Sequence, residues 1–145
     1  MPLVSRRKLY KEIETRMYET FWEAISKVKS KSEVQSFLSD LLSPVERTMI
    51  AKRLAIAALL LRGHGYENIK DLLKVSGATI AKVSAVINTN TGYKMVVNKI
   101  ATSESTREFW QDVENLLYRM SAPGRVFLPE ETVKYKLKHK RKTLV

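Results

Sequence analysis

Residues 65–87 read GYENIKDLLKVSGATIAKVSAVI, a pattern that predicts two short helices joined by a tight turn. Ile69, Leu72 and Leu73 recur at the i, i+3, i+4 spacing of one helix face. Ser76 is a good N-cap for the second helix, because its hydroxyl can accept a hydrogen bond from a backbone N–H in the first turn. The whole chain is predicted to be organised around this helix pair.

The second helix of the pair begins with small side chains. Its inner face is predicted to hold Ile80, Val83 or Ser84, and Ile87. Its exposed first turn holds Gly77, Ala78 and Ala81, with Lys82 beside them. A helix that enters the DNA major groove needs such an end, since base edges and phosphates must come close. Residues 65–88 are therefore predicted to form a helix-turn-helix, and the alternative is an ordinary helical hairpin.

Composition narrows the class of protein. The chain has 145 residues, enough for one domain with a core. Its 26 Lys and Arg against 15 Asp and Glu give a net charge of +11, which favours a polyanionic partner such as nucleic acid or an anionic membrane surface. The longest apolar run, Leu54 to Leu61, is far shorter than a membrane span, and no apolar signal region follows Met1. We therefore expect a soluble cytoplasmic protein that does not enter a membrane.

No local pattern predicts catalysis. The chain has no Cys, which excludes disulfides and thiolate metal sites. His64 and His139 have no metal partner at i+3 or i+4. No Gly-rich phosphate loop is present, and the carboxylates are spread over helix surfaces and caps. We therefore predict no enzyme activity, no metal and no cofactor.

The N-terminal part is predicted to be one long amphipathic helix over residues 5–29. Large apolar side chains recur along it: Leu9, Ile13, Met17, Phe21, Ile25 and Val28. Such a stripe packs either in the core of the chain or against another subunit. The subunit interface is favoured, because a helix at the end of a small domain has few neighbours.

Two further helices are predicted before the motif. Ser30 and Glu33 match a capping box that opens a short helix. The segment 43–46 (Ser-Pro-Val-Glu) starts another helix, which runs to Arg62 and ends at Gly63 as the C′ residue. Its second half is apolar on every face and is predicted to be the central strut.

After the motif, residues 93–100 resume a short helical pattern. Ser105 and Glu108 match another capping box, which predicts a last helix. The apolar face of this helix comprises Phe109, Trp110, Val113, Leu116, Leu117 and Met120. We expect this face to pack in the core or against a second subunit. The predicted helical domain covers residues 1–121.

Residues 122–145 are predicted to form a basic tail. From Arg119 to the end there are eight basic and two acidic residues, a net charge of +6. Residues 133–140 alternate as in a strand, but a flexible tail is favoured over a hairpin because no other segment reads as a strand. Such a tail either adds salt-sensitive contacts to phosphates or only aids solubility.

Several blocks of the chain together resemble the Trp repressor superfamily, and most closely its YerC/YecD-like branch. They are Leu41-Leu42-Ser43-Pro44-Val45-Glu46-Arg47, Lys52-Arg53-Leu54, Leu60-Leu61-Arg62-Gly63, Ala78-Thr79-Ile80 and Asn90-Thr91-Gly92-Tyr93-Lys94. The resemblance spans about residues 31–100. It implies an all-α, Trp-repressor-like helical bundle that forms an intertwined homodimer. It also implies that Lys70 lies on the DNA side and that the first turn after Ser76 meets bases.

The resemblance also indicates a candidate effector pocket, and there the chain departs from the family. In the Trp repressor the indole of the corepressor lies between two arginines. Arg53 matches the first, but the second falls on Lys82, which lacks a planar guanidinium, and Val83 follows where the repressor has a small residue. We therefore expect no tryptophan binding of the family's kind, while another small-molecule effector stays open.

The sequence thus predicts a homodimeric, sequence-specific transcriptional regulator, of the repressor type, that binds double-stranded DNA. The predicted DNA-binding residues are Lys70, Lys74, Ser76, Gly77, Ala78, Thr79, Ala81 and Lys82. The alternatives are a DNA-binding protein of a transposase or recombination system, a basic RNA-binding protein and a protein-interaction module.

Overall fold

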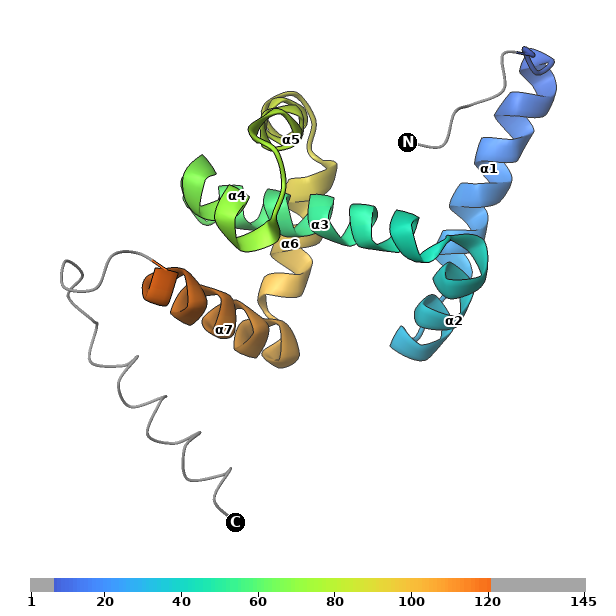
Figure 1. Cartoon of the computed structure of the whole chain (residues 1–145). Coiled ribbons are helices and arrows are strands. Elements are labelled where there is room, and N and C mark those ends of the chain that lie inside the picture. Colours follow the sequence, from blue (N-terminus) through green and yellow to red (C-terminus); the bar gives the residue numbers. More distant parts are fainter. Residues whose placement is uncertain (1–6, 121–145) are drawn as a thin grey trace. The chain divides into compact units, whose positions relative to one another are not determined.

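The computed structural model describes residues 7–120, and within this range it contains seven α-helices and no strand (Figure 1). The helices are α1 (Lys11–Lys27), α2 (Lys31–Leu41), α3 (Pro44–Leu61), α4 (Tyr66–Leu73), α5 (Gly77–Thr89), α6 (Gly92–Ala101) and α7 (Glu104–Met120). The all-α class is as predicted. The predicted basic tail, residues 122–145, lies outside the described residues. No described helix is both long and apolar enough to cross a membrane.

The chain divides between Met49 and Ile50 into two units. The first contains α1, α2 and the start of α3, and none of the residues of α1 and α2 is buried. The second contains the rest of α3 and the helices α4 to α7. The predicted division at residue 121 is not tested by this arrangement, so it stays a prediction.

Local capping signals set the start of two helices. At α2, the Ser30 hydroxyl accepts from the Glu33 N–H at 3.2 Å, and the Glu33 carboxylate accepts from the Ser30 N–H at 3.2 Å. At α3, the carboxylate of Glu46 accepts from the Ser43 N–H at 2.8 Å, while the Ser43 hydroxyl accepts from the Glu46 N–H at 3.3 Å. Both capping boxes are as predicted.

Two predicted helix starts are wrong. The first helix begins at Lys11 rather than near residue 5, and its first turn contains Glu12 and Glu14. These acids interact favourably with the positive end of the helix dipole, whereas the basic residues upstream would not. The last helix begins at Glu104, before the predicted cap Ser105, and its first backbone bond runs from the Arg107 N–H to the Ser103 carbonyl. An acidic residue at its first position favours this earlier start.

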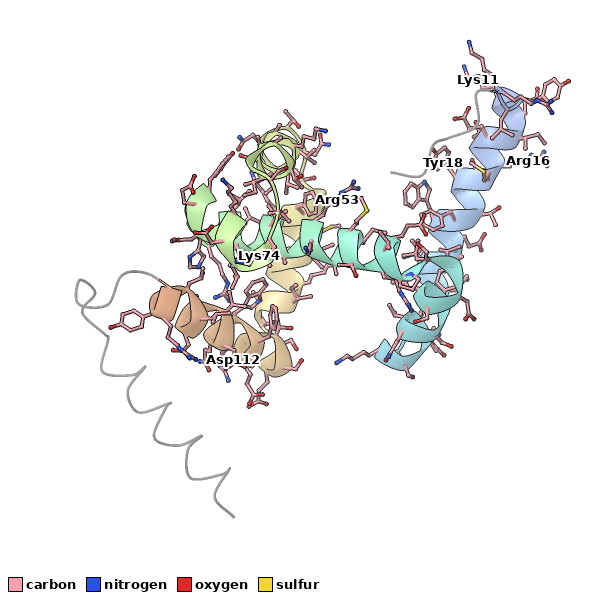
Figure 2. All side chains as sticks on the ribbon, viewed as in Figure 1. Lys11, Arg16, Tyr18, Arg53, Lys74 and Asp112 are labelled. Atoms are coloured by element: carbon pink, nitrogen blue, oxygen red, sulfur yellow. The ribbon has the colours of Figure 1, made fainter. Side chains whose placement is uncertain are left out.

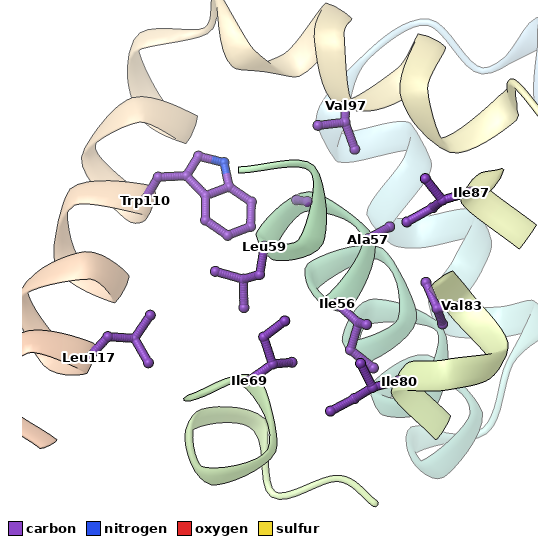
Figure 3. Packing of buried hydrophobic residues seen from close by; sticks show 11 residues of the cluster. Ile56, Ala57, Leu59, Ile69, Ile80, Val83, Ile87, Val97, Trp110 and Leu117 are labelled. Carbon is purple, nitrogen blue, oxygen red and sulfur yellow. The ribbon is translucent and has the colours of Figure 1, made fainter. Parts of the chain in front are cut away.

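The core of the second unit forms around the C-terminal half of α3. Ile56, Ala57, Ala58 and Leu59 are fully or almost fully buried, so the apolar strut is as predicted. Figure 3 shows the residues that surround it: Ile69 of α4, Ile80, Val83 and Ile87 of α5, Val97 of α6, and Trp110 and Leu117 of α7. The strut therefore anchors every later helix.

The end of α3 is closed by a glycine. Gly63 has a φ of +86°, its N–H donates to the Leu60 carbonyl, and the His64 N–H donates to the Leu59 carbonyl. This pair of bonds is a Schellman motif, in which the left-handed residue favours glycine. The chain turns here from the strut into the predicted motif.

Candidate nucleic-acid interface

The turn between α4 and α5 consists of residues 74–76. Lys74 has a φ of +52° and a ψ of +56°, and in the described residues it is the one non-glycine residue with positive φ. Its N–H donates to the Lys70 carbonyl, which ends α4. A lysine therefore occupies a left-handed position that glycine would adopt at lower cost.

Ser76 fixes the start of α5. Its hydroxyl accepts from the Thr79 N–H at 3.2 Å and lies 3.0 Å from the Thr79 hydroxyl. The predicted N-cap is therefore confirmed, and it places two hydroxyl groups beside the first turn of α5.

One face of α5 is buried and its first turn is exposed. Ile80, Val83 and Ile87 are buried, so Val83 rather than Ser84 completes the inner face. Gly77, Ala78 and Ala81 are exposed. A Cβ placed on Gly77 would meet no atom within 4 Å, so the packing of this chain does not require glycine there.

The turn and α5 carry charge of one sign, whereas α4 exposes Glu67 and Asp71 as well as Lys70. Between Leu72 and Ser103 the chain contains no Asp or Glu, and its charged residues are Lys74, Lys82, Lys94 and Lys99. Lys74 and Lys82 are exposed, as is Lys70 on α4. Ion pairs in the described part of the chain involve other residues, so these lysines face solvent without a carboxylate within 4.0 Å. This acid-free stretch was not noted from the sequence, although a charge count by segment would have shown it.

The residues of the candidate effector pocket differ in burial, and the pocket stays a prediction. Val83 is buried in the core, and Lys82 on α5 is exposed. Arg53, labelled on α3 in Figure 2, is exposed as well. Val83 therefore packs against protein. No cluster of three or more His, Asp or Glu that could hold a metal ion occurs in residues 7–120.

A second polar cluster links α7 to the end of α3. The Nη1 atom of Arg62 lies 2.9 Å from Oε1 of Glu114, and its guanidinium carbon lies 5.0 Å from the centre of the Trp110 ring. The sequence did not predict this cluster. Arg62 and Glu114 are 52 positions apart in the chain, and no local spacing pattern links residues so distant.

The first unit exposes aromatic and aliphatic side chains of α1. Ile13, Met17, Tyr18, Phe21, Trp22 and Ile25 are all at least about one-third exposed. Trp22 makes ring contacts with two of them: its ring centre lies 6.2 Å from that of Tyr18 and 5.2 Å from that of Phe21. The unit has little core of its own to cover this face.

The structure defines an all-α protein in which the first turn of α5 and the lysines beside it are exposed. The chain belongs to the Trp repressor protein family. Residues 16–101 of the chain match the pattern of that family. This is a family of helical DNA-binding regulators rather than enzymes. The resemblance predicted from the sequence blocks is thereby confirmed.

A solved structure supports the same assignment. The chain is similar to a structure described as a TrpR like protein from Eubacterium eligens, with 26% identity and a TM-score of 0.59. The similarity covers 66% of this chain and 99% of that chain. No curated protein matches the chain.

Proposed function

We propose that the protein is a sequence-specific transcriptional regulator that binds duplex DNA through α4, the turn and α5. The observation that carries the proposal is the exposed first turn of α5, small and free of acidic residues, capped by Ser76. Lys70, Lys74 and Lys82 are the proposed phosphate contacts, and Ser76 and Thr79 add polar contacts. Gly77, Ala78 and Ala81 would lie against base edges, where shape and thymine methyl groups are read.

We propose a homodimer as the binding form. The apolar face of α1 is exposed in the single chain, and a helix face of this kind is stable in water only when another surface covers it. A second copy would present two reading helices to one side of the DNA. Half-sites should then lie about 34 Å apart, one turn of the duplex. Because such a regulator must reach chromosomal DNA, we propose a cytoplasmic location for the protein.

The proposed regulator does not depend on tryptophan. The position of the second family arginine is Lys82, which cannot stack on an indole as a guanidinium does, and the buried Val83 follows it. Addition of tryptophan should therefore leave the affinity for DNA unchanged.

The test is selection of genomic DNA fragments by the unmodified full chain, followed by binding of three variants to the recovered duplex. Lys82→Glu and Ala78→Glu should each weaken binding at least about tenfold, because each sets a carboxylate against phosphates or base edges. Lys99→Glu, on α6, makes the same charge change as Lys82→Glu and should have a smaller effect. Helical content should be unchanged in all three.

Other outcomes would identify a different function. Recovery of a single transposon-end sequence would point to a recombination system. Stronger binding to structured RNA than to duplex, insensitive to Ala78→Glu, would point to an RNA-binding protein. If the double variant Lys82→Glu with Ala78→Glu binds duplex as well as the unmodified chain, the α5 surface is not the DNA-binding surface.

A further inference from the structure

The helices around the end of α3 form a closed ring. α4 packs against α5, α5 against α6, α6 against α7, and α7 against α4. Figure 3 shows Trp110 of α7 directed at Leu59 of α3, on the side of the core opposite Val83 of α5. Without α7, the ring would be open between α6 and α4.

The helix that closes the ring lies outside the family match. The match ends at residue 101, and α7 begins at Glu104. Even so, α7 contributes two buried residues, Trp110 and Leu117, to the single core of the unit. This chain therefore supports its reading helix with an element that the shared family segment does not supply.

Arg62 fastens α7 to the point where the chain turns from α3 into α4. Its guanidinium makes an ion pair with Glu114 and a cation–π contact with Trp110, both on α7. The ion pair is screened by water, since the two side chains are 31% and 48% exposed. Trp110 is only 5% exposed, so the contact with its ring is better shielded from solvent.

The position of Arg62 along the chain lets this contact affect the direction in which α4 begins. Arg62 directly precedes Gly63, whose left-handed backbone sets the direction of the following segment. α4 begins three residues later, at Tyr66. α7 therefore constrains α4 in two ways. It binds Arg62 in the connection that precedes α4, and it packs directly against α4.

We propose that α7 is an intramolecular brace that holds α4 and α6 at a fixed spacing, with Arg62 as its positioning residue, so that α5 meets DNA at one angle. The DNA part of this inference rests on the proposed function. A fixed angle matters most for base contacts, which need the helix in register with the groove. Phosphate contacts made by flexible lysines tolerate a change of angle.

The test compares two brace variants with one matched control in the full chain. Arg62→Lys keeps the charge but loses the planar guanidinium, and Glu114→Gln removes the ion pair. The control is Glu108→Gln, the same substitution on the same helix, at an exposed residue that makes no ion pair within the described part of the chain. The first measurement is hydrogen exchange of the α4 amides without DNA. Exchange should become about threefold to tenfold faster in the brace variants and stay unchanged in the control.

The second measurement is affinity for two duplexes, one recovered from genomic DNA by the unmodified chain and one with the same bases in scrambled order. The brace variants should lose about threefold to tenfold in affinity for the recovered duplex and keep their affinity for the scrambled one. Equal losses on both duplexes would mean that Arg62 has a structural role only, and would overturn the positioning role.

Hydrogen exchange keeps the two proposals apart. Unchanged exchange in α4, or the same change in Glu108→Gln, would overturn the brace whatever the DNA data show. If the unmodified chain prefers no duplex over the scrambled one, the proposed function fails, and exchange in α4 still decides whether α7 braces the helix pair.

Discussion

The hydroxyl of Ser76 lies 3.2 Å from the backbone nitrogen of Thr79 and accepts its hydrogen bond. The same oxygen lies 3.0 Å from the Thr79 hydroxyl, so one side chain orders both a backbone donor and a side chain at the tip of α5. Ser76 therefore contributes both to the stability of α5 and to the proposed DNA contact. Different substitutions of Ser76 should change these two properties independently.

Ser76→Ala should lower the free energy of unfolding by about 1 kcal/mol, because α5 loses its N-cap. Denaturation with urea, followed by circular dichroism, measures this loss. Affinity for DNA should fall as well, since the first turn of α5 is less ordered in the variant. An unchanged unfolding midpoint would show that the cap contributes nothing to the stability of the fold.

Ser76→Asp should keep the stability of the fold and lose affinity for DNA. Aspartate is also a good N-cap and its charge interacts favourably with the helix dipole, so stability should be kept or raised. The added negative charge would face the phosphates, so duplex affinity should drop at least about tenfold. Full binding by this variant would place the phosphates away from the tip of α5.

Lys74→Gly should make the protein more stable and a weaker DNA binder. Glycine relieves the left-handed conformation at φ +52°, which costs about 1 kcal/mol for a residue with a Cβ. Loss of one phosphate contact should reduce the slope of log affinity against log salt by about 1. Urea denaturation and titrations at several salt concentrations measure the two effects. An unchanged salt slope would remove Lys74 from the DNA contacts.

Gly77→Ala tests whether the lack of a side chain at this position serves close contact with DNA rather than packing of the fold. Gly77 is the first residue of α5, and its Cβ position is open space, so alanine should stabilise the helix by roughly 0.5 kcal/mol. Against DNA, the extra methyl group should clash and weaken binding. Gly92→Ala is the matched control, because Gly92 also begins a helix and also faces open space. The control should gain similar stability and bind as before. Equal binding by both variants would mean that DNA does not approach Gly77 closely.

Features that depend on a few neighbouring residues could be predicted from the sequence. The caps at Ser30, Ser43 and Ser76 are satisfied within three residues, so their patterns are complete in the sequence. The predicted start of the last helix failed because Ser103 and Ser105 are both good N-cap residues. A local pattern does not say which of the two begins the helix.

Features that depend on distant residues could not be predicted. Nothing in the sequence near Arg62 indicates that its partners are Glu114 and Trp110 on another helix. Likewise, the apolar stripe of α1 predicted an amphipathic helix, but the same stripe fits a core or an interface. The structure leaves that face exposed in the single chain, which the sequence alone could not establish.

Glu46 should make folding sensitive to acid. The pKa of its carboxyl is lowered, first by the Ser43 backbone N–H and then by the Ser43 hydroxyl, which both donate to the ionised form. A lowered pKa in the folded state means that the cap stabilises the protein above the ordinary value of 4.5, and that this contribution is lost as the pH falls through the folded-state pKa. Glu46→Gln should therefore melt below the unmodified chain at neutral pH, and the difference should shrink as the pH falls below 4.5. A constant difference across this range would show that the charge of Glu46 does not matter.

Trp22 and Trp110, the chain's two tryptophans, should report separately on association and on the core. Trp22 is 59% exposed in the single chain and Trp110 is 5% exposed. If a second copy covers α1, the variant Trp110→Phe, which keeps only Trp22, should emit at longer wavelength and be quenched more by acrylamide on dilution, because dissociation uncovers that ring. The variant Trp22→Phe keeps only the buried Trp110 and should show no dependence on concentration. Analytical ultracentrifugation of both variants gives the mass directly. A monomer at all concentrations, with Trp22 equally quenched throughout, would contradict the homodimer.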